Sequence, residues 1–308
     1  MRRQPGARLS VSELAAAALA SAVFLAGASP AFALRVVAAT NDLGALARAV
    51  GGPEIELDVV ARADRDPHAL EVRPSTLRKT AKADMYLEVG FDLDAWSAHI
   101  VRGSRNRDLI VVPCSEVIEP AEVPTGPVDA SQGDVHPQGN PHYWLDPQNA
   151  VRVAEHLAAV FADADPDHAA DYLRRAAEFA ASVEERLPAW RAALEGRRFV
   201  EYHRTWVYFA ERFGMTIAGE VEPFPGIPPG ARHLALLAET IRRDSVPVVV
   251  RQVYHPDSPL DFLHRETGVR VEVLPASCAE PTPAAYLELI EHAVRILGGH
   301  GPPGEDGP

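Results

Sequence analysis

Short runs of β-branched and aliphatic residues alternate with amphipathic stretches from residue 34 onward. This alternation predicts βα units and therefore a parallel sheet. In the first half of the chain we expect four strands with helices between them. The predicted strands cover residues 35–39, 56–60, 85–89 and 109–112, and the predicted helices cover 43–50, 74–81 and 93–101.

The same alternation returns in the last third of the chain, which predicts a second sheet of the same kind. The helical stretches there carry apolar residues at steps of three and four, as amphipathic helices do. The predicted strands cover residues 198–202, 216–221, 246–253 and 269–274, and the predicted helices cover 206–213, 231–242, 259–266 and 284–297.

Between the two sets lie an aperiodic segment and two helical patterns. Residues 115–141 lose periodicity and are predicted to be a loop, and residues 148–161 form the first helical pattern. The second runs from residue 165 to about 194, and its apolar residues form one stripe. At ~1.5 Å per residue it would span on the order of 45 Å, enough to connect two lobes. Its stripe consists of Tyr172, Ala176, Phe179, Val183 and Leu187.

We therefore predict an α/β protein with two lobes, each with a four-stranded, mainly parallel sheet flanked by helices. A long rigid α-helix joins the lobes. The predicted parts are a signal peptide (1–33), an N-terminal lobe (34–164), a linker helix (165–196), a C-terminal lobe (197–299) and a disordered tail (300–308).

The first 33 residues have the pattern of a secretory signal. Arg2, Arg3 and Arg8 precede an apolar run over residues 14–26, and Ala31-Phe32-Ala33 is a small-x-small cleavage site. The run is short for the ~20 residues that a spanning helix needs. We expect the protein to be exported to the periplasm through this cleaved signal.

Net charge bears on the class of partner, and the cysteines bear on a possible disulfide. The net charge is −13, which argues against nucleic acid and anionic lipid as partners. Only Cys114 and Cys278 are present, and an oxidising compartment permits a disulfide between them. Whether they pair depends on their distance, which the sequence leaves open.

Three histidines stand at predicted turns or strand ends. His68 follows the second predicted strand, His142 ends the long loop after the fourth, and His203 follows the first strand of the second lobe. Ligands in open α/β sheets bind beyond the carboxyl ends of the strands, so these imidazoles can converge in a cleft. Converging imidazoles are typical of a transition-metal site. We therefore predict a metal site in the cleft between the lobes, so that residues 34–164 and 197–299 are each a metal-binding lobe.

Each of these histidines alone is as compatible with a hydrogen-bonded structural residue, but the three together favour a metal site. His255 is the one further histidine near a carboxyl edge. His136 lies in the 115–141 loop, where we expect ordinary solvent exposure. The histidines on predicted helices are expected to be solvated.

At this point the chain resembles the zinc- and manganese-binding proteins of bacterial metal ABC importers, whose two lobes are joined by a rigid helix. The resemblance covers nearly all of the chain after the signal, and its five pieces are specific only together and in order. They are residues 66–75 (Asp-Pro-His-Ala-Leu-Glu-Val-Arg-Pro-Ser), 83–96, 142–147 (His-Tyr-Trp-Leu-Asp-Pro), 202–210 and 222–229.

The resemblance implies that His68, His142 and His203 are metal ligands. The family often adds an Asp after the last strand, and Ala276 occupies that position here. The fourth position then falls to water or, with less support, to His255, Glu201 or Glu222. Three imidazoles and a water suit Zn²⁺ better than Mn²⁺, which prefers oxygen ligands.

The resemblance implies a solute-binding protein that captures zinc and delivers it to a membrane ABC permease. We expect a monomer without enzymatic activity, and a periplasmic metallochaperone is a further candidate partner. The alternative is a zinc-dependent hydrolase or hydratase, because three histidines and a water also form a catalytic zinc site. An adhesin has no sequence feature in its favour.

Overall fold

The computed structural model describes residues 33–128 and 132–299. The predicted signal peptide, apart from its last residue, and the predicted tail lie outside the described residues. No helix in the described ranges is both long and apolar enough to cross a membrane.

The first sheet contains four parallel strands in the order β2-β1-β3-β4. Strand β1 is almost wholly buried, and its residue Thr40 caps α2 by accepting the backbone N–H of Leu43 through Oγ1 at 3.4 Å. The elements of this half are β1 (Leu34–Thr40), α2 (Asn41–Gly51), β2 (Ile55–Ala61), α3 (Pro74–Thr80), β3 (Met85–Glu88), α4 (Ser97–Ser104) and β4 (Ile110–Pro113).

The second sheet repeats this arrangement, with four parallel strands in the order β6-β5-β7-β8. Both sheets therefore confirm the predicted two-lobed α/β architecture. The elements of this half are β5 (Arg198–Glu201), α7 (Val207–Phe213), β6 (Thr216–Glu220), α8 (Ala231–Arg243), β7 (Val248–Arg251), α9 (Ser258–Thr267) and β8 (Arg270–Val273).

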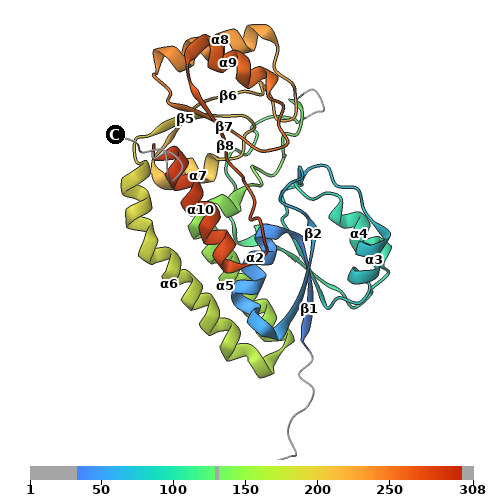
Figure 1. Cartoon of the computed structure of the whole chain (residues 1–308). Helices are drawn as coiled ribbons and strands as arrows, with labels where there is room; N and C mark the ends of the chain where they lie inside the picture. The colour runs from blue at the N-terminus through green and yellow to red at the C-terminus, as the bar shows by residue number, and fades with distance from the viewer. Residues whose placement is uncertain (1–32, 129–131, 300–308) are drawn as a thin grey trace, which may run out of the picture. The chain divides into compact units, whose positions relative to one another are not determined.

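Two helices connect the sheets. After α5 (Pro147–Ala164), the long helix α6 (Ala169–Leu194) runs from the first half of the molecule to the second (Figure 1). Its predicted stripe is buried at Tyr172 and Phe179. The last helix, α10 (Pro283–Leu297), returns to pack on α2 and α6. The chain therefore crosses between the two sheets twice.

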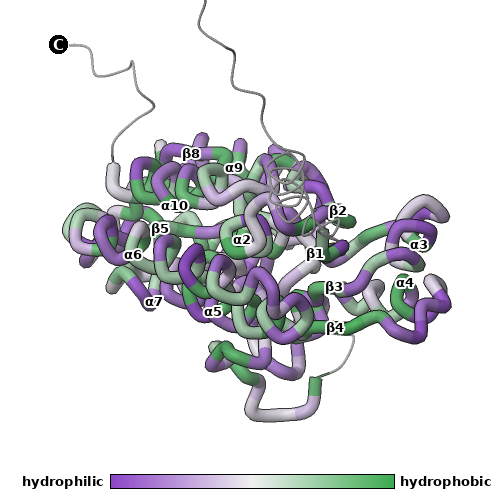
Figure 2. Tube along the Cα trace, turned by 90° about the horizontal axis from the view of Figure 1, so that it is seen from below, coloured by the Kyte–Doolittle hydropathy of each residue, from purple (hydrophilic) through white to green (hydrophobic). Residues whose placement is uncertain are grey.

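The larger core surrounds the first sheet and extends over α5, α6, α7 and α10. A smaller core lies beneath α8 and α9 in the second half. Helices α2 and α5 alternate hydrophobic and hydrophilic positions along the tube, as the sequence pattern predicts (Figure 2). Cys114 and Cys278 are both buried and free, so they form no disulfide with each other.

Candidate metal centre

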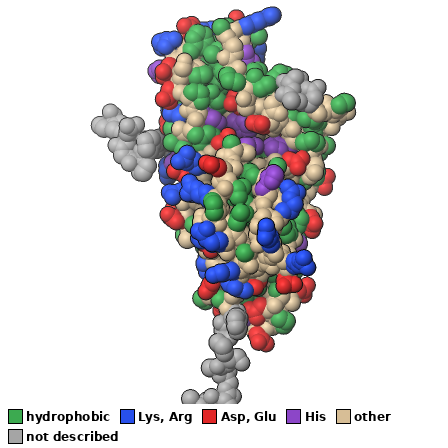
Figure 3. Space-filling model, turned by 90° about the vertical axis from the view of Figure 1, so that its right-hand side faces the viewer, with side chains coloured by type: hydrophobic (Ala, Val, Ile, Leu, Met, Phe, Trp, Pro, Cys, Tyr) green, Lys and Arg blue, Asp and Glu red, His purple; other side chains and the backbone are tan. Residues whose placement is uncertain are grey.

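The structure brings together the three histidines at the strand ends. His68 lies beyond β2, His142 precedes the short turn of residues 143–145, and His203 follows β5. One nitrogen from each ring belongs to a set whose atoms all lie within 4.8 Å of one another. In the described part of the chain this is the one such group of histidine, cysteine or acidic side chains. Histidines also gather in a band across one face of the molecule (Figure 3).

His142 is oriented by a neutral amide. Its Nδ1–H and its backbone N–H both donate to Asn140 Oδ1 at 3.0 Å, which leaves Nε2 free to face the site. The ring is only 4% exposed. The neighbouring Tyr143 hydroxyl donates to the Val89 carbonyl at 2.8 Å and fixes this segment to the first sheet.

His203 is oriented by a carboxylate. Its Nδ1–H donates to Glu222 Oε2 at 2.9 Å, and the same oxygen accepts the Gly226 N–H at 2.8 Å. Glu222 therefore fixes the ring with Nε2 directed away from it. A carboxylate on the outer nitrogen also raises the basicity of a metal-binding histidine. Glu222, a predicted alternative for the fourth position, is thus engaged with His203.

His68 is held through the backbone around it. Its N–H donates to Asp66 Oδ1 at 2.9 Å, and the indole N–H of Trp96 donates to the Pro67 carbonyl at 2.9 Å. The ring atom Nε2 is buried and has no hydrogen-bond partner among the described residues. A buried, unpaired nitrogen of this kind is costly unless something binds it.

The three rings pack closely, and burial keeps two of them neutral. Their centroids lie 5.4 to 5.7 Å apart. Burial lowers the pKa of His68 and His142 well below the ordinary 6.5, and charge on neighbouring histidines lowers it further. Neutral imidazole is the form that binds metal, so His68 and His142 have the protonation state that a metal ligand needs at neutral pH.

His136 corrects one expectation. It is not a solvated loop residue: its ring stacks on His68 with centroids 5.1 Å apart, and its Nε2 is buried without a partner among the described residues. Burial lowers its pKa to about 4. The ring nevertheless stays outside the set of three converging nitrogens.

The loop reaches this position by docking on the second lobe. Asp134 N–H donates to the Pro225 carbonyl at 2.8 Å, and Gly133 has a φ of +72°. A Cβ atom at Gly133 would lie 2.0 Å from the Pro225 oxygen, so the close approach requires glycine. Gly133, three residues before His136, is the sequence feature that could have indicated this close approach.

The other predicted candidates for the fourth position are engaged elsewhere. His255 stacks on Tyr202, with ring centroids 4.1 Å apart, and its Nδ1 accepts the Gln252 N–H. Glu201 Oε2 accepts the N–H groups of Thr205 and Trp206 at 2.9 and 2.8 Å. Burial raises the pKa of Glu201 to about 8. Glu201 therefore shapes the turn that carries His203.

Ala276 lines the same cavity as His142 and offers no side-chain donor atom. Its carbonyl accepts the indole N–H of Trp144 at 2.8 Å, and Trp144 in turn contacts the His142 ring. A small cavity of about 40 Å³ borders His142, His203 and His136 on another side. The protein thus supplies three converging imidazoles and leaves further coordination positions open.

Comparison with known proteins gives one family over most of the chain. Residues 36–298 match the family described as ZnuA, zinc-uptake complex component A, periplasmic. The iron-binding protein YfeA of Yersinia pestis is 26% identical over 280 residues, covering 85% of each chain. The high-affinity zinc uptake system protein ZnuA of Brucella abortus (strain 2308) is 30% identical over 161 residues, covering 51% of this chain and 48% of that protein.

A solved structure supports the same architecture. The crystal structure of a ZnuA protein superposes with a TM-score of 0.74 at 22% identity, covering 86% of this chain and 98% of the other. At that identity the likeness concerns the fold. The two parallel sheets and the connecting helix are thus shared with a protein of this type.

Proposed function

Because the chain belongs to the ZnuA family of periplasmic zinc-uptake components, we propose that it captures Zn²⁺ outside the cytoplasm and delivers it to a membrane ABC permease. The observation that carries this proposal is the convergence of three imidazoles from the two lobes, with ligand atoms that all lie within 4.8 Å of one another. Imidazole nitrogens suit zinc, and a site assembled from two lobes can open to release its cargo.

We assign the ligands as His68, His142 and His203, with water in the fourth position. The unpaired Nε2 of His68 supports this set, because a bound cation would satisfy it. The hydrogen bonds to Asn140 and Glu222 support it as well, since each occupies the outer nitrogen of its histidine. Zinc accepts three imidazoles and a water, whereas Mn²⁺ favours more oxygen ligands.

The same geometry favours transport over zinc hydrolysis. A hydrolase needs a base within reach of the zinc-bound water. The two carboxyl groups that we considered for this are Glu201 and Glu222; Oε2 of Glu201 accepts two backbone N–H groups and Oε2 of Glu222 accepts His203 Nδ1–H, so both side chains are already used to hold the turn and the ring of His203. The placement of these side chains supports an oriented binding site for a cation.

Titration of the purified protein with Zn²⁺, Mn²⁺ and Fe²⁺ tests the proposal. We expect tight binding of one Zn²⁺ per chain, with zinc preferred over manganese. A bound metal at ~1,000 times its dissociation constant adds about 4 kcal/mol to the free energy of unfolding, so the melting temperature should rise and fall again on addition of a chelator. His99, exposed on α4, gives a matched control through His99→Ala.

A protein that bound no zinc, or whose melting curve ignored both zinc and the chelator, would contradict the proposal. Tighter binding of Fe²⁺ or Mn²⁺ than of Zn²⁺ would contradict the assignment of the cargo. Delivery can be tested by whether growth at limiting zinc depends on this chain together with the permease genes.

A further inference from the structure

A second, much larger cavity borders the candidate metal centre. Its volume is about 560 Å³, within the range of roughly 300–1,000 Å³ typical of small-molecule sites. A bare metal ion with its water needs only a small fraction of that space. His142 lines this cavity and is also one of the three converging histidines, so the cavity and the centre share a wall residue.

The cavity exists partly because residue 276 is small. Ala276 lines it, and the adjoining walls are apolar: Pro67, Trp144, Val253 and Tyr254. Alanine brings no donor atom and little bulk to this wall. Because His142 lines the same cavity, a ligand held there can lie beside one of the three converging histidines.

Gln252 supplies a polar group without a partner. The residue is 4% exposed and lines the cavity, and its Oε1 is buried with no hydrogen-bond partner among the described residues. Its Nε2 donates only a long hydrogen bond of 3.4 Å to Thr205 Oγ1. An unpaired buried acceptor is unfavourable, so an N–H or O–H donor next to this oxygen would stabilise it.

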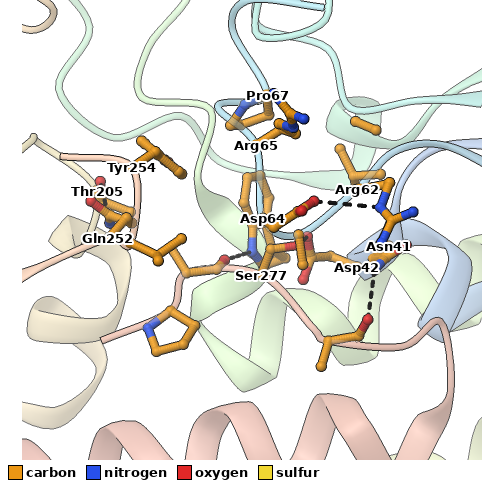
Figure 4. A pocket seen from close by; sticks show the side chains of 18 of the residues that line it. Asn41, Asp42, Arg62, Asp64, Arg65, Pro67, Thr205, Gln252, Tyr254 and Ser277 are labelled. Carbon is orange, nitrogen blue, oxygen red and sulfur yellow. Dashed lines mark hydrogen bonds and ion pairs between the residues drawn. The ribbon is translucent and has the colours of Figure 1, made fainter. Parts of the chain in front are cut away.

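The charged groups lie mainly on the opposite wall (Figure 4). The guanidinium of Arg65 is exposed and makes no ion pair or side-chain hydrogen bond within the described ranges, whereas Arg62 pairs with Asp64 at 3.4 Å. Asp42 is buried and accepts Ser277 Oγ and the Cys278 N–H. Arg65 is therefore the cavity's available cation, and it suits a carboxylate.

We propose that this cavity binds a small amino-carboxylate chelator together with the metal. One donor atom of the chelator takes the open coordination position beside Ala276. An N–H of the chelator donates to Gln252 Oε1, and its carboxylate pairs with Arg65. The apolar walls accommodate the rest of the molecule. This inference rests on the proposed function and deepens it, because the cargo becomes a metal complex.

L-histidine and histamine are the probes, because they share an imidazole and an amine and differ in the carboxylate. Zinc binding is measured at fixed free Zn²⁺ concentrations, so that chelation in solution does not enter the comparison. We expect L-histidine to raise the apparent zinc affinity of the wild type about tenfold, in the usual range of coupling between two ligands. Histamine should give a smaller gain.

Variants of residues that line the cavity test whether L-histidine acts from there. Val253 lines the cavity and is 61% exposed, so the larger side chain of Val253→Trp should fill the cavity. In this variant, L-histidine should not raise the affinity for zinc above the value measured without L-histidine. Arg65→Ala should reduce the gain with L-histidine to that with histamine. The matched control is Arg243→Ala, an exposed arginine on α8 that lies outside the cavity and should keep the full gain.

The inference fails if L-histidine leaves the wild-type affinity for zinc unchanged, or if Val253→Trp keeps the gain. Either result leaves intact the proposal that the protein binds zinc. By contrast, a wild type that bound no zinc under any condition would overturn the proposed function itself. The melting temperature of the zinc-loaded protein, with and without L-histidine, gives a second readout.

Discussion

The two sides of the candidate centre hold their histidines by opposite electrostatics. On the side of the first sheet, His142 donates Nδ1–H to the neutral Asn140 amide. On the side of the second sheet, His203 donates Nδ1–H to the Glu222 carboxylate. Both arrangements leave Nε2 available, but only the second places a carboxylate on the outer nitrogen of a converging histidine.

The two sides also differ in how firmly they are built. Asn140, His142 and Trp144 are all at most 6% exposed, and they form part of the contact between the lobes. Asn140 itself donates to Glu122 and to the Arg204 carbonyl. His203 stands on a turn held by the carboxylates of Glu201 and Glu222. The first side is held by buried packing and amide hydrogen bonds, whereas the second depends on the carboxyl groups of two glutamates.

Loss of a ligand should have the largest effect. His68→Ala, His142→Ala and His203→Ala should each weaken zinc binding by more than the 10–100-fold typical for loss of an outer hydrogen-bond partner. His142→Ala should also lower the free energy of unfolding of the metal-free protein most, because that ring is the most buried of the three. Calorimetric titration and melting curves measure both. Zinc affinity unchanged in any of the three variants would refute that ligand's assignment.

The stability of the metal-free protein should fall in acid. Burial lowers the pKa of His136 to about 4 and that of His255 to about 3, and it lowers those of His68 and His142 as well. Below the unfolded value of about 6.5, the unfolded chain takes up protons that the folded chain does not. Stability is therefore lost as pH drops from about 6.5 towards 4, by up to about 1.4 kcal/mol per pH unit for each such ring.

Denaturant melts between pH 7 and pH 4, with and without zinc, measure this loss. Zinc should keep the protein stable to lower pH, because protons must then displace the metal. If the free energy of unfolding of the metal-free protein did not change between pH 7 and pH 4, these histidine rings would have to be solvated.

Exchange of the two orienting groups should separate charge from orientation. Glu222→Gln keeps an acceptor for His203 and removes the charge, so zinc affinity should fall about tenfold with little loss of stability. Asn140→Asp adds a charge at His142 but turns its donors to Glu122 and the Arg204 carbonyl into acceptors. It should destabilise the fold by about 1–3 kcal/mol. Equal losses of stability in Glu222→Gln and Asn140→Asp would contradict the proposed difference between the two sides.

The smallest effect concerns metal choice. Ala276→Asp adds a carboxylate beside His142 and should improve Mn²⁺ binding proportionally more than Zn²⁺ binding, by a few-fold, because manganese is the harder ion. Competition titrations on both proteins measure the ratio, with Ala276→Asn as the uncharged control. An unchanged ratio would mean that the new carboxylate does not reach the metal.

Much of this architecture follows from local pattern. The alternation of strands and helices predicted both sheets, because βα units form parallel sheets, and the strand ends predicted which histidines meet. The burial of His136 against His68 was not predicted, because its loop has no periodicity. Its position depends on the contact of the loop with Pro225 in the other lobe. Glu222 was expected as a possible ligand, but only the folded geometry places it on the outer nitrogen of His203. The positions of the domain boundaries remain predictions.

The double crossing between the sheets has a mechanical consequence. The chain leaves the first sheet along α6 and comes back through residues 274–282 into α10, which packs on α2 and α6. A body attached at two separate points cannot swivel freely, and it can only bend about the line that joins the attachments. Capture and release of cargo should therefore involve one bending motion between the two halves. The three imidazoles should return to the same relative positions each time the halves close.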